Sequence, residues 1–257
     1  MDDFFTLLDE LYQAGDLAGV ESLLQKTLER QKGADRVTLL NELGGFYRGI
    51  SRYEESAHAF GQALTLLEET GQAQGSGYAT VLLNLAGTYR LTGALEQAEK
   101  FLRQALTMLD NEDDAYVGVV NALSMVRMEQ GALEDAADLE TQALNWLERH
   151  GNPDHEVAVT LTNLAALQLK NGSLSQAADL LGQALTLFEA MREPDIHHAA
   201  ALAAMGAVHF HRGELDKAET AYQGALEMTE HFFGQNDEYA VARAALETVR
   251  KARRAGL

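Results

Sequence analysis

Hydrophobic residues return along the chain three or four positions apart, which is the spacing of amphipathic helices. Between residues 83 and 108 they form two such runs, with Leu85 in the first, Leu102 and Leu106 in the second, and Gly93 between them. A pattern of this period predicts two α-helices that each bury one face. One pair of helices cannot enclose that face by itself. Its repetition along the chain therefore predicts that neighbouring pairs stack.

The repeating unit is about forty residues long. A small residue marks the expected contact between the two helices of each unit, at Gly44, Ala86, Ser124, Ala165 and Gly206, with separations of 42, 38, 41 and 41 residues. Small residues also recur at two positions of the second helix, at Ser56, Ala98, Ala136, Ala177 and Ala218, and seven residues later at Ala63, Ala105, Ala143, Ala184 and Ala225. Side chains this small at a fixed spacing predict a helix face that closely approaches another backbone.

A short turn containing glycine joins the two helices of each pair. The glycines are Gly15, Gly93, Gly131, Gly172 and Gly213. Ser51 replaces the glycine in the first regular unit. Glycine takes the left-handed conformation that often ends a helix at little steric cost, so these positions predict the helix ends.

The regularity of the pattern divides the chain into three parts. Residues 36–235 hold five regular helical pairs, and residues 1–35 hold a degenerate pair in which Leu8 and Thr27 replace small residues. Residues 236–257 predict one more helix without a partner of its own. An end unit covers only one neighbour, so both ends fit a capping role. We therefore expect a single all-α solenoid domain over residues 1–257, with about six helical pairs and a C-terminal capping helix.

Composition and charge narrow the classes of partner. The chain has 257 residues, two prolines, no cysteine and a formal net charge of −19 that is spread through the repeats. Distributed acid argues against binding nucleic acid or a membrane surface, because both need clustered Lys and Arg. Basic residues gather only near the end, at Arg243, Arg250, Lys251, Arg253 and Arg254, where they are expected to complement the helix dipole.

Targeting signals are not evident in the sequence. No run of about 18 apolar residues predicts a membrane span. The N-terminal stretch MDDFFTLLDELYQAGD lacks the basic and apolar regions of a secretory signal. Unless a leader has been removed, we expect a cytoplasmic location.

The pattern resembles the tetratricopeptide repeat. The small residue eight places into each unit, the aromatic residue at Tyr47 and Tyr89, the turn glycine and the two alanines carry the resemblance. The long period is similar to the kinesin light chain variety, whose units open with a pattern close to TLTNLA at residues 160–165. In that variety an asparagine at the position of Asn84 and Asn163 holds the backbone of a ligand. The other three units carry Glu42, Ala122 and Ala204 there.

The resemblance implies a right-handed α-α superhelix that binds a protein or peptide partner without enzymatic activity or a cofactor. The first helix of each unit would line the concave side, and helical phase selects the side chains that face it. The candidate peptide-binding residues are Arg48, Asn84, Gly87, Arg90, Leu91, Met125, Met128, Asn163, Leu169, Lys170 and Phe210. We expect a segment or helix of a partner protein to bind them.

These candidates divide into polar and apolar groups, each with a second interpretation. Arg48, Asn84 and Arg90 suit a carboxylate or a peptide backbone, but the arginines could equally pair with acids such as Glu42. The apolar candidates suit the anchor side chains of a partner, and packing against the next repeat is the alternative. The polar residues are therefore the stronger indication of a ligand.

Catalytic and metal-binding motifs are missing. The stretch Gly71–Gly77 joins two helices and follows no strand, so it is not a phosphate loop. His155 and Glu156 open a zinc protease motif whose second histidine is replaced by Val159. We expect a binding protein with no metal or cofactor, or alternatively a regulatory sensor that responds to a peptide or metabolite. The sequence leaves the partner's identity and the oligomeric state open.

Overall fold

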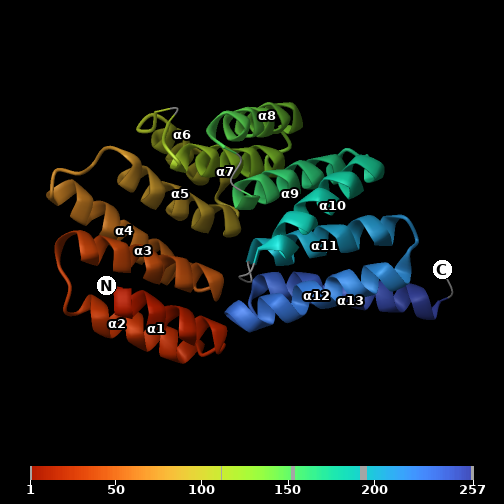
Figure 1. Ribbon diagram of the computed structural model, residues 1–257, viewed down its shortest axis with the longest axis horizontal. Helices are drawn as coiled ribbons and strands as arrows, with labels where there is room; N and C mark the ends of the chain where they lie inside the picture. The colour runs from red at the N-terminus through yellow and green to blue at the C-terminus, as the bar shows by residue number, and fades with distance from the viewer. Residues whose placement is uncertain (1, 111, 152–153, 192–195, 256–257) are drawn as a thin grey trace. The chain divides into compact units, whose positions relative to one another are not determined.

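The computed structural model describes residues 2–110, 112–151, 154–191 and 196–255. Within these residues it contains thirteen α-helices and no strand (Figure 1), which confirms the all-α prediction. The helices are α1 Asp2–Gln13, α2 Leu17–Leu28, α3 Gly33–Gly49, α4 Tyr53–Glu69, α5 Ser76–Leu91, α6 Leu95–Leu106, α7 Ala115–Glu129, α8 Leu133–His150, α9 Asp154–Lys170, α10 Leu174–Ala190, α11 Ile196–His211, α12 Leu215–Phe233 and α13 Asp237–Arg254.

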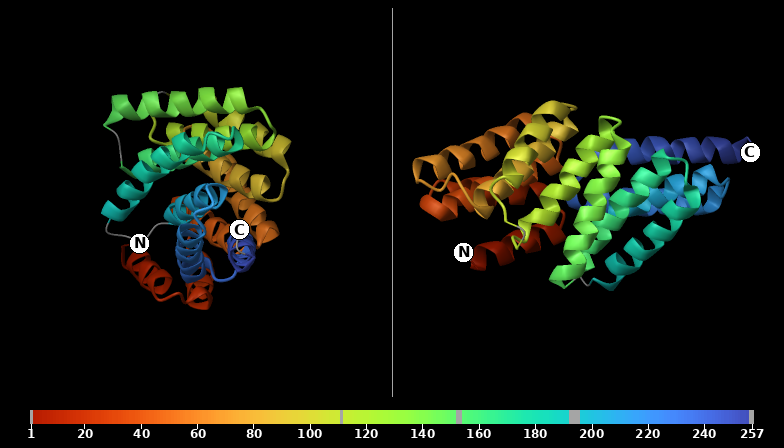
Figure 2. Two further views of the ribbon diagram at one scale, coloured as in Figure 1. Left: turned by 90° about the vertical axis from the view of Figure 1, so that its right-hand side faces the viewer. Right: turned by 90° about the horizontal axis from the view of Figure 1, so that it is seen from above.

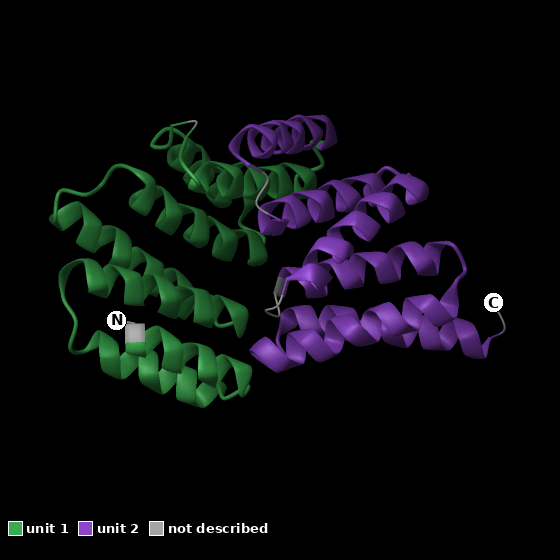
Figure 3. Ribbon diagram, viewed as in Figure 1, with its two compact units in different colours: residues 1–132 green, residues 133–257 purple. Residues whose placement is uncertain are grey.

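The chain divides into two compact units, residues 1–132 and 133–257 (Figure 3). Unit 1 holds α1 to α7 and unit 2 holds α8 to α13. The expectation of one continuous domain over residues 1–257 stays a prediction. Residues 256 and 257 of the expected C-terminal segment lie outside the described residues.

Unit 1 consists of stacked helical pairs. The pairs are α1 with α2, α3 with α4, and α5 with α6, and each also contacts the first helix of the next pair. The first helices α3, α5 and α7 contact one another in that order. Residues about forty positions apart in the sequence therefore lie on adjacent helices, as a solenoid of such repeats requires.

Unit 2 continues the pattern with α9 paired to α10 and α11 paired to α12. Helix α13 runs beside α12 (Figure 1 and Figure 2), and its Leu246 and Val249 are buried against Tyr222 and Leu226. The basic residues of α13 do more than complement its dipole. The Arg250 guanidinium donates to Glu219 at 2.8 Å, so charge as well as apolar contact joins α13 to α12.

The turns have the backbone geometry that the glycine pattern predicts. Gly93 follows α5 with a φ of 79°, and Ser51 follows α3 with a φ of 61° at the equivalent position. The same two hydrogen bonds close both turns. After α5, Gly93 N donates to Arg90 O and Ala94 N to Tyr89 O; after α3, Ser51 N donates to Arg48 O and the next amide to Tyr47 O. This is the Schellman arrangement that ends a helix.

The small residues lie at close helix contacts, as predicted. A Cβ atom on Gly44 would come within 2.7 Å of the Phe60 ring, and one on Gly206 within 2.9 Å of the Tyr222 ring. The recurring alanines of the second helices are at most 1% exposed. Glycine and alanine therefore let the two helices of a pair approach so closely that larger side chains would collide.

Candidate functional site

Seven of the predicted binding residues lie on three adjacent helices of unit 1. Arg48 lies on α3, four candidates lie on α5, and Met125 and Met128 lie on α7. Because α5 contacts both α3 and α7, we expect six of these residues, all but the buried Met128, to share one surface. We call it the first-helix face and define it by Arg48, Asn84, Gly87, Arg90, Leu91 and Met125.

Arg48 is held by contacts that join α3 to α5. Its Nη1 donates to the backbone oxygen of Asn84 at 3.0 Å, and its guanidinium carbon lies 6.0 Å from the centre of the Phe60 ring. A Cβ atom on Gly87 would lie 2.7 Å from Arg48 Nη1. Gly87 therefore makes room for the arginine, a role that the sequence pattern did not suggest.

The Asn84 amide also bonds to the neighbouring first helix. Its Nδ2 donates to Oδ1 of Asn41 on α3 at 2.9 Å, which leaves its own Oδ1 as an acceptor. Sequence reasoning missed Asn41 because only the ligand-facing phase of each helix was considered. The signal available was two asparagines at neighbouring positions of adjacent first helices.

Arg90 forms an ion pair across to α7. Its Nη1 lies 2.6 Å from Oε1 of Glu129, and the two side chains are 22% and 30% exposed. The acid partner is therefore Glu129 rather than Glu42. An arginine has five N–H donors, so the guanidinium keeps donors beyond the one that this pair uses.

The end of unit 1 near α1 is acidic. Burial raises the pKa of the Glu42 carboxyl above its ordinary value, and repulsion by the Asp9 carboxylate raises this pKa further. Burial also raises the pKa of the Tyr12 hydroxyl, with the same two carboxylates adding to the effect. Glu42 occupies on α3 the position that Asn84 occupies on α5. The ligand-facing phase of unit 1 therefore carries an acid on α3 and an amide on α5.

The apolar candidates of unit 1 differ in their accessibility. Met128 is only 8% exposed and belongs to the core, so it cannot act as a ligand contact in this structure. Leu91 and Met125 are partly exposed. The packing interpretation therefore holds for Met128, and the other two residues remain available to a partner.

The remaining candidates lie in unit 2, on the adjacent helices α9 and α11. Leu169 packs against the core between α9 and α10, and Phe210 packs against the core of α12 and α13. Lys170 is exposed. The Nδ2 atom of Asn163 is buried and has no hydrogen-bond partner among the described residues. Two of the four candidates therefore contribute to core packing.

No described helix is long and apolar enough to cross a membrane. The described residues also contain no group of three or more His, Cys, Asp or Glu side chains placed to hold a metal ion. In the acidic turn after α6, Asp110 and Asp113 instead accept backbone N–H groups at 2.8 Å.

Family profiles match most of the chain. One profile, described as tetratricopeptide repeat, matches residues 35–111 and 116–190. A second profile of the same description matches residues 198–239. Among curated proteins, no sequence matches the chain.

Solved structures of similar fold cover nearly the whole chain at low sequence identity. NprR in complex with its cognate peptide NprX is 18% identical with a TM-score of 0.70, over 96% of this chain and 70% of that one. TTC0263, a thermophilic tetratricopeptide repeat protein of Thermus thermophilus, is 19% identical with a TM-score of 0.60, over 84% and 99%. The anaphase-promoting complex hetero-tetramer Cut9–Hcn1 is 15% identical with a TM-score of 0.65; the match covers 96% of this chain and 42% of that one. At these identities the likeness shows the fold.

Proposed function

Because the chain belongs to the tetratricopeptide repeat family, we propose that it is a non-enzymatic scaffold for protein–protein interaction. The first-helix face would bind a peptide segment or a helix of a partner protein. Arg48, Asn84 and Arg90 would supply the polar contacts, and Leu91 and Met125 the apolar ones. The structure of NprR with its peptide supports this proposal by analogy of fold.

The observation that carries the proposal is that the polar side chains of this face are held in place before any ligand arrives. Arg48, Asn84 and Arg90 each make a contact to an adjacent first helix, at 3.0, 2.9 and 2.6 Å. All three remain partly exposed. Side chains that are already ordered lose less entropy on binding, so such a face binds more tightly than a flexible one.

Gly45 on α3 supports the idea that a ligand can approach the first-helix face. A Cβ atom on Gly45 would meet no atom within 4 Å beyond the backbone of its own helix, so packing against other side chains and helices does not require glycine there. Glycine inside a helix costs about 0.5–1 kcal/mol relative to alanine. A space without a packing role leaves room for the backbone of a ligand to approach α3.

A displayed random peptide library selected on the native protein tests the proposal. Selected peptides are then measured on the triple variant Arg48→Ala, Asn84→Ala and Arg90→Ala. A matched control removes the same residue types from exposed second-helix positions, at Arg103, Asn145 and Arg149. We expect the control to bind like the native protein and the first-helix variant to bind about tenfold or more weakly.

Two results would contradict the proposal. One is a selection that yields no binding peptide. The other is a set of peptides that bind the first-helix variant as tightly as the native protein, which would move recognition to another surface. Circular dichroism of each variant verifies that its helices are intact.

The second candidate function is a regulatory sensor, and the division of the chain into two compact units favours it. A ligand that binds one arrangement of the units better than another would shift the population between them. Small-angle scattering with and without a selected peptide separates the two functions. A change in radius of gyration on binding supports the sensor, and unchanged dimensions support the scaffold.

A further inference from the structure

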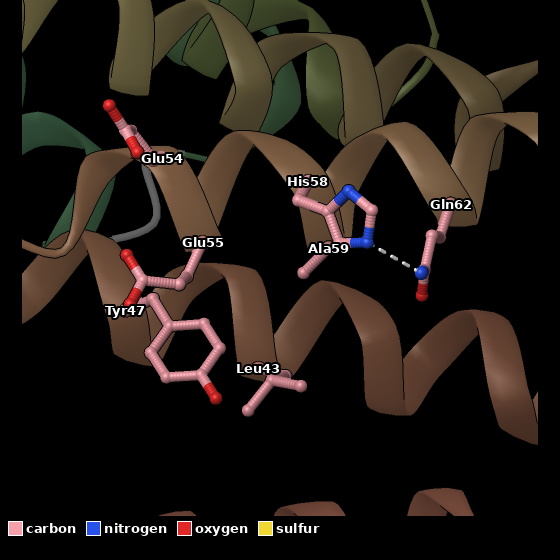
Figure 4. Close-up of a pocket in the computed structure, with 7 residues that line it drawn as sticks. All are labelled: Leu43, Tyr47, Glu54, Glu55, His58, Ala59 and Gln62. Carbon is pink, nitrogen blue, oxygen red and sulfur yellow. Dashed lines mark hydrogen bonds between the residues drawn. The ribbon is translucent and has the colours of Figure 1, made fainter.

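A cavity lies between α3 and α4 (Figure 4), and none of its lining residues belongs to the first-helix face. It has a volume of about 350 Å³. Leu43 and Tyr47 of α3 and Ala59 of α4 form an apolar floor, and Glu54 and Glu55 lie at the rim. We call this cavity the α3–α4 pocket.

The repeat register explains why the pocket exists. The position of Ala59 is taken by Phe101, Leu139 and Leu180 in three other units and by Ala221 in the last regular unit. In the α5–α6 pair, the Phe101 ring lies 5.5 Å from the ring of Tyr89, the residue that corresponds to Tyr47. Alanine at position 59 lacks this large side chain and leaves the space beside Tyr47 open.

The floor of the pocket already interacts with one guanidinium. Arg52 lies with its guanidinium carbon 4.4 Å from the centre of the Tyr47 ring. The same guanidinium pairs with Glu55 at 2.9 Å and with Glu21 of α2 at 2.8 Å. A planar cation stacked on an aromatic ring and fixed by carboxylates is a favourable arrangement for arginine in particular.

Negative charge remains at the rim after this pairing. Two carboxylates, from Glu21 and Glu55, pair with the single guanidinium of Arg52, and Glu54 adds a third carboxylate at the rim. The hydrogen bond from Arg52 lowers the pKa of Glu55, so that carboxylate stays ionised at neutral pH. Glu54 is exposed and forms no ion pair with any described residue. The rim therefore favours a second cation.

His58 and Gln62 form the remaining edge of the pocket (Figure 4). Gln62 Nε2 lies 2.8 Å from His58 Nε2. The amide nitrogen can only donate, so the histidine nitrogen accepts this hydrogen bond.

We propose that the α3–α4 pocket binds an arginine side chain from a segment of a partner protein. The aliphatic part of that side chain would lie on Leu43, Ala59 and the Tyr47 ring, and its guanidinium would pair with Glu54. The net charge of −19 attracts basic segments at longer range. This site is separate from the first-helix face and does not depend on the function proposed for that face.

The test uses two short peptides, acetyl-Leu-Arg-Leu-amide and the same peptide with citrulline in place of arginine. Citrulline has nearly the shape of arginine without its charge. Binding is followed by the chemical shifts of backbone amides in the native, isotope-labelled protein. We expect the arginine peptide to shift Leu43, Tyr47 and Ala59, and the citrulline peptide to bind about tenfold more weakly.

Two variants locate the site. Ala59→Leu inserts the side chain that two other units carry at this position, and it should abolish the shifts while the protein remains folded. Glu54→Gln should weaken binding of the arginine peptide about threefold or more. The matched control is Ala244→Leu, an exposed position on α13, which should bind like the native protein.

Three outcomes would overturn the proposal. The peptides could bind equally, which would make the pocket an apolar site. The arginine peptide could cause no shifts, or shifts on the first-helix face instead. It could also bind Ala59→Leu and Glu54→Gln as tightly as the native protein. None of these outcomes would affect the peptide selection that tests the first-helix face.

Discussion

A buried hydroxyl pair joins three helices of unit 1, and its removal gives a defined prediction. Ser56 of α4 is fully buried, and its Oγ donates to the backbone oxygen of Gly44 on α3 at 2.8 Å. The same Oγ lies 2.8 Å from Oγ1 of Thr88 on α5, which is 1% exposed. The Thr88 hydroxyl has a further acceptor in the backbone oxygen of Asn84, at 3.4 Å.

The expected cost follows from counting these hydrogen bonds. Each buried hydrogen bond contributes about 0.5–1.5 kcal/mol net. Ser56→Ala removes two bonds and should lower the free energy of unfolding by about 2 kcal/mol. Thr88→Val keeps the side-chain shape and removes the shared bond together with the long, 3.4 Å bond to the Asn84 backbone oxygen, for about 1 kcal/mol. The double variant should lose about 2 kcal/mol, since the shared bond is counted in both single variants.

Urea denaturation of the four proteins, followed by circular dichroism, measures these differences. Hydrogen exchange of the α3, α4 and α5 amides reports the same differences locally if the two units unfold separately. Thr65→Val is the control, because that hydroxyl is exposed and bonds only within α4. It should change stability by less than about 0.5 kcal/mol.

The decisive quantity is the coupling energy between Ser56 and Thr88, which is the difference between the effect of the double variant and the sum of the two single effects. A coupling energy near zero would refute the shared hydrogen bond. Ser56→Ala could also stabilise the protein, because alanine is the residue of the other units at this position. That result would show that the hydroxyl costs more to bury than its two hydrogen bonds return.

Three further changes test other parts of the structure. Gly87→Ala should displace the Arg48 guanidinium, which would lie 2.7 Å from the new Cβ atom, and weaken peptide binding on the first-helix face. The thermal stability of this variant should stay nearly constant, because the higher helix propensity of alanine, worth about 1 kcal/mol, offsets the loss of the Arg48 hydrogen bond. A large drop in melting temperature on calorimetry would contradict this. Glu42→Gln should raise the urea midpoint at neutral pH, because burial and a nearby acid raise the pKa of Glu42 and penalise its charged form. The gain should vanish as the pH falls to the ordinary value of 4.5, where the native carboxyl also becomes protonated, and an equal gain at both pH values would exclude a charge effect. Leu246→Ala, at a residue 3% exposed, should cost about 2–5 kcal/mol by denaturation if α13 covers α12, whereas Val241→Ala at 72% exposure should cost under about 0.5 kcal/mol.

Local features of this chain follow from the sequence because helical hydrogen bonds join residues only three to five positions apart. The turn after α3 shows how local this control is. Ser51 stands in place of glycine, and yet it takes a φ of 61° and the same two capping bonds as the turn at Gly93. The position in the repeat therefore predicts the conformation even where the usual residue is missing. The same register predicted the buried alanines of the second helices.

Helical phase predicts which residues share a helix face, but it does not predict which residues of neighbouring helices they contact. The period of the helix predicts that Arg48, Asn84 and Arg90 share one face of α3 and α5. Their partners are set by how neighbouring helices cross. Arg90 meets Glu129 rather than Glu42, and Met128 turns into the core.

The α3–α4 pocket separates the two kinds of information most clearly. The sequence by itself determined that position 59 carries alanine where three of the other four regular units carry phenylalanine or leucine. Only the tertiary structure decided that this substitution leaves a cavity beside Tyr47, with Arg52 stacked on the same ring. The reason is physical. Helix periodicity repeats over a few residues of one segment, whereas a cavity depends on side-chain volumes from several helices whose separation must be known to within an ångström or so.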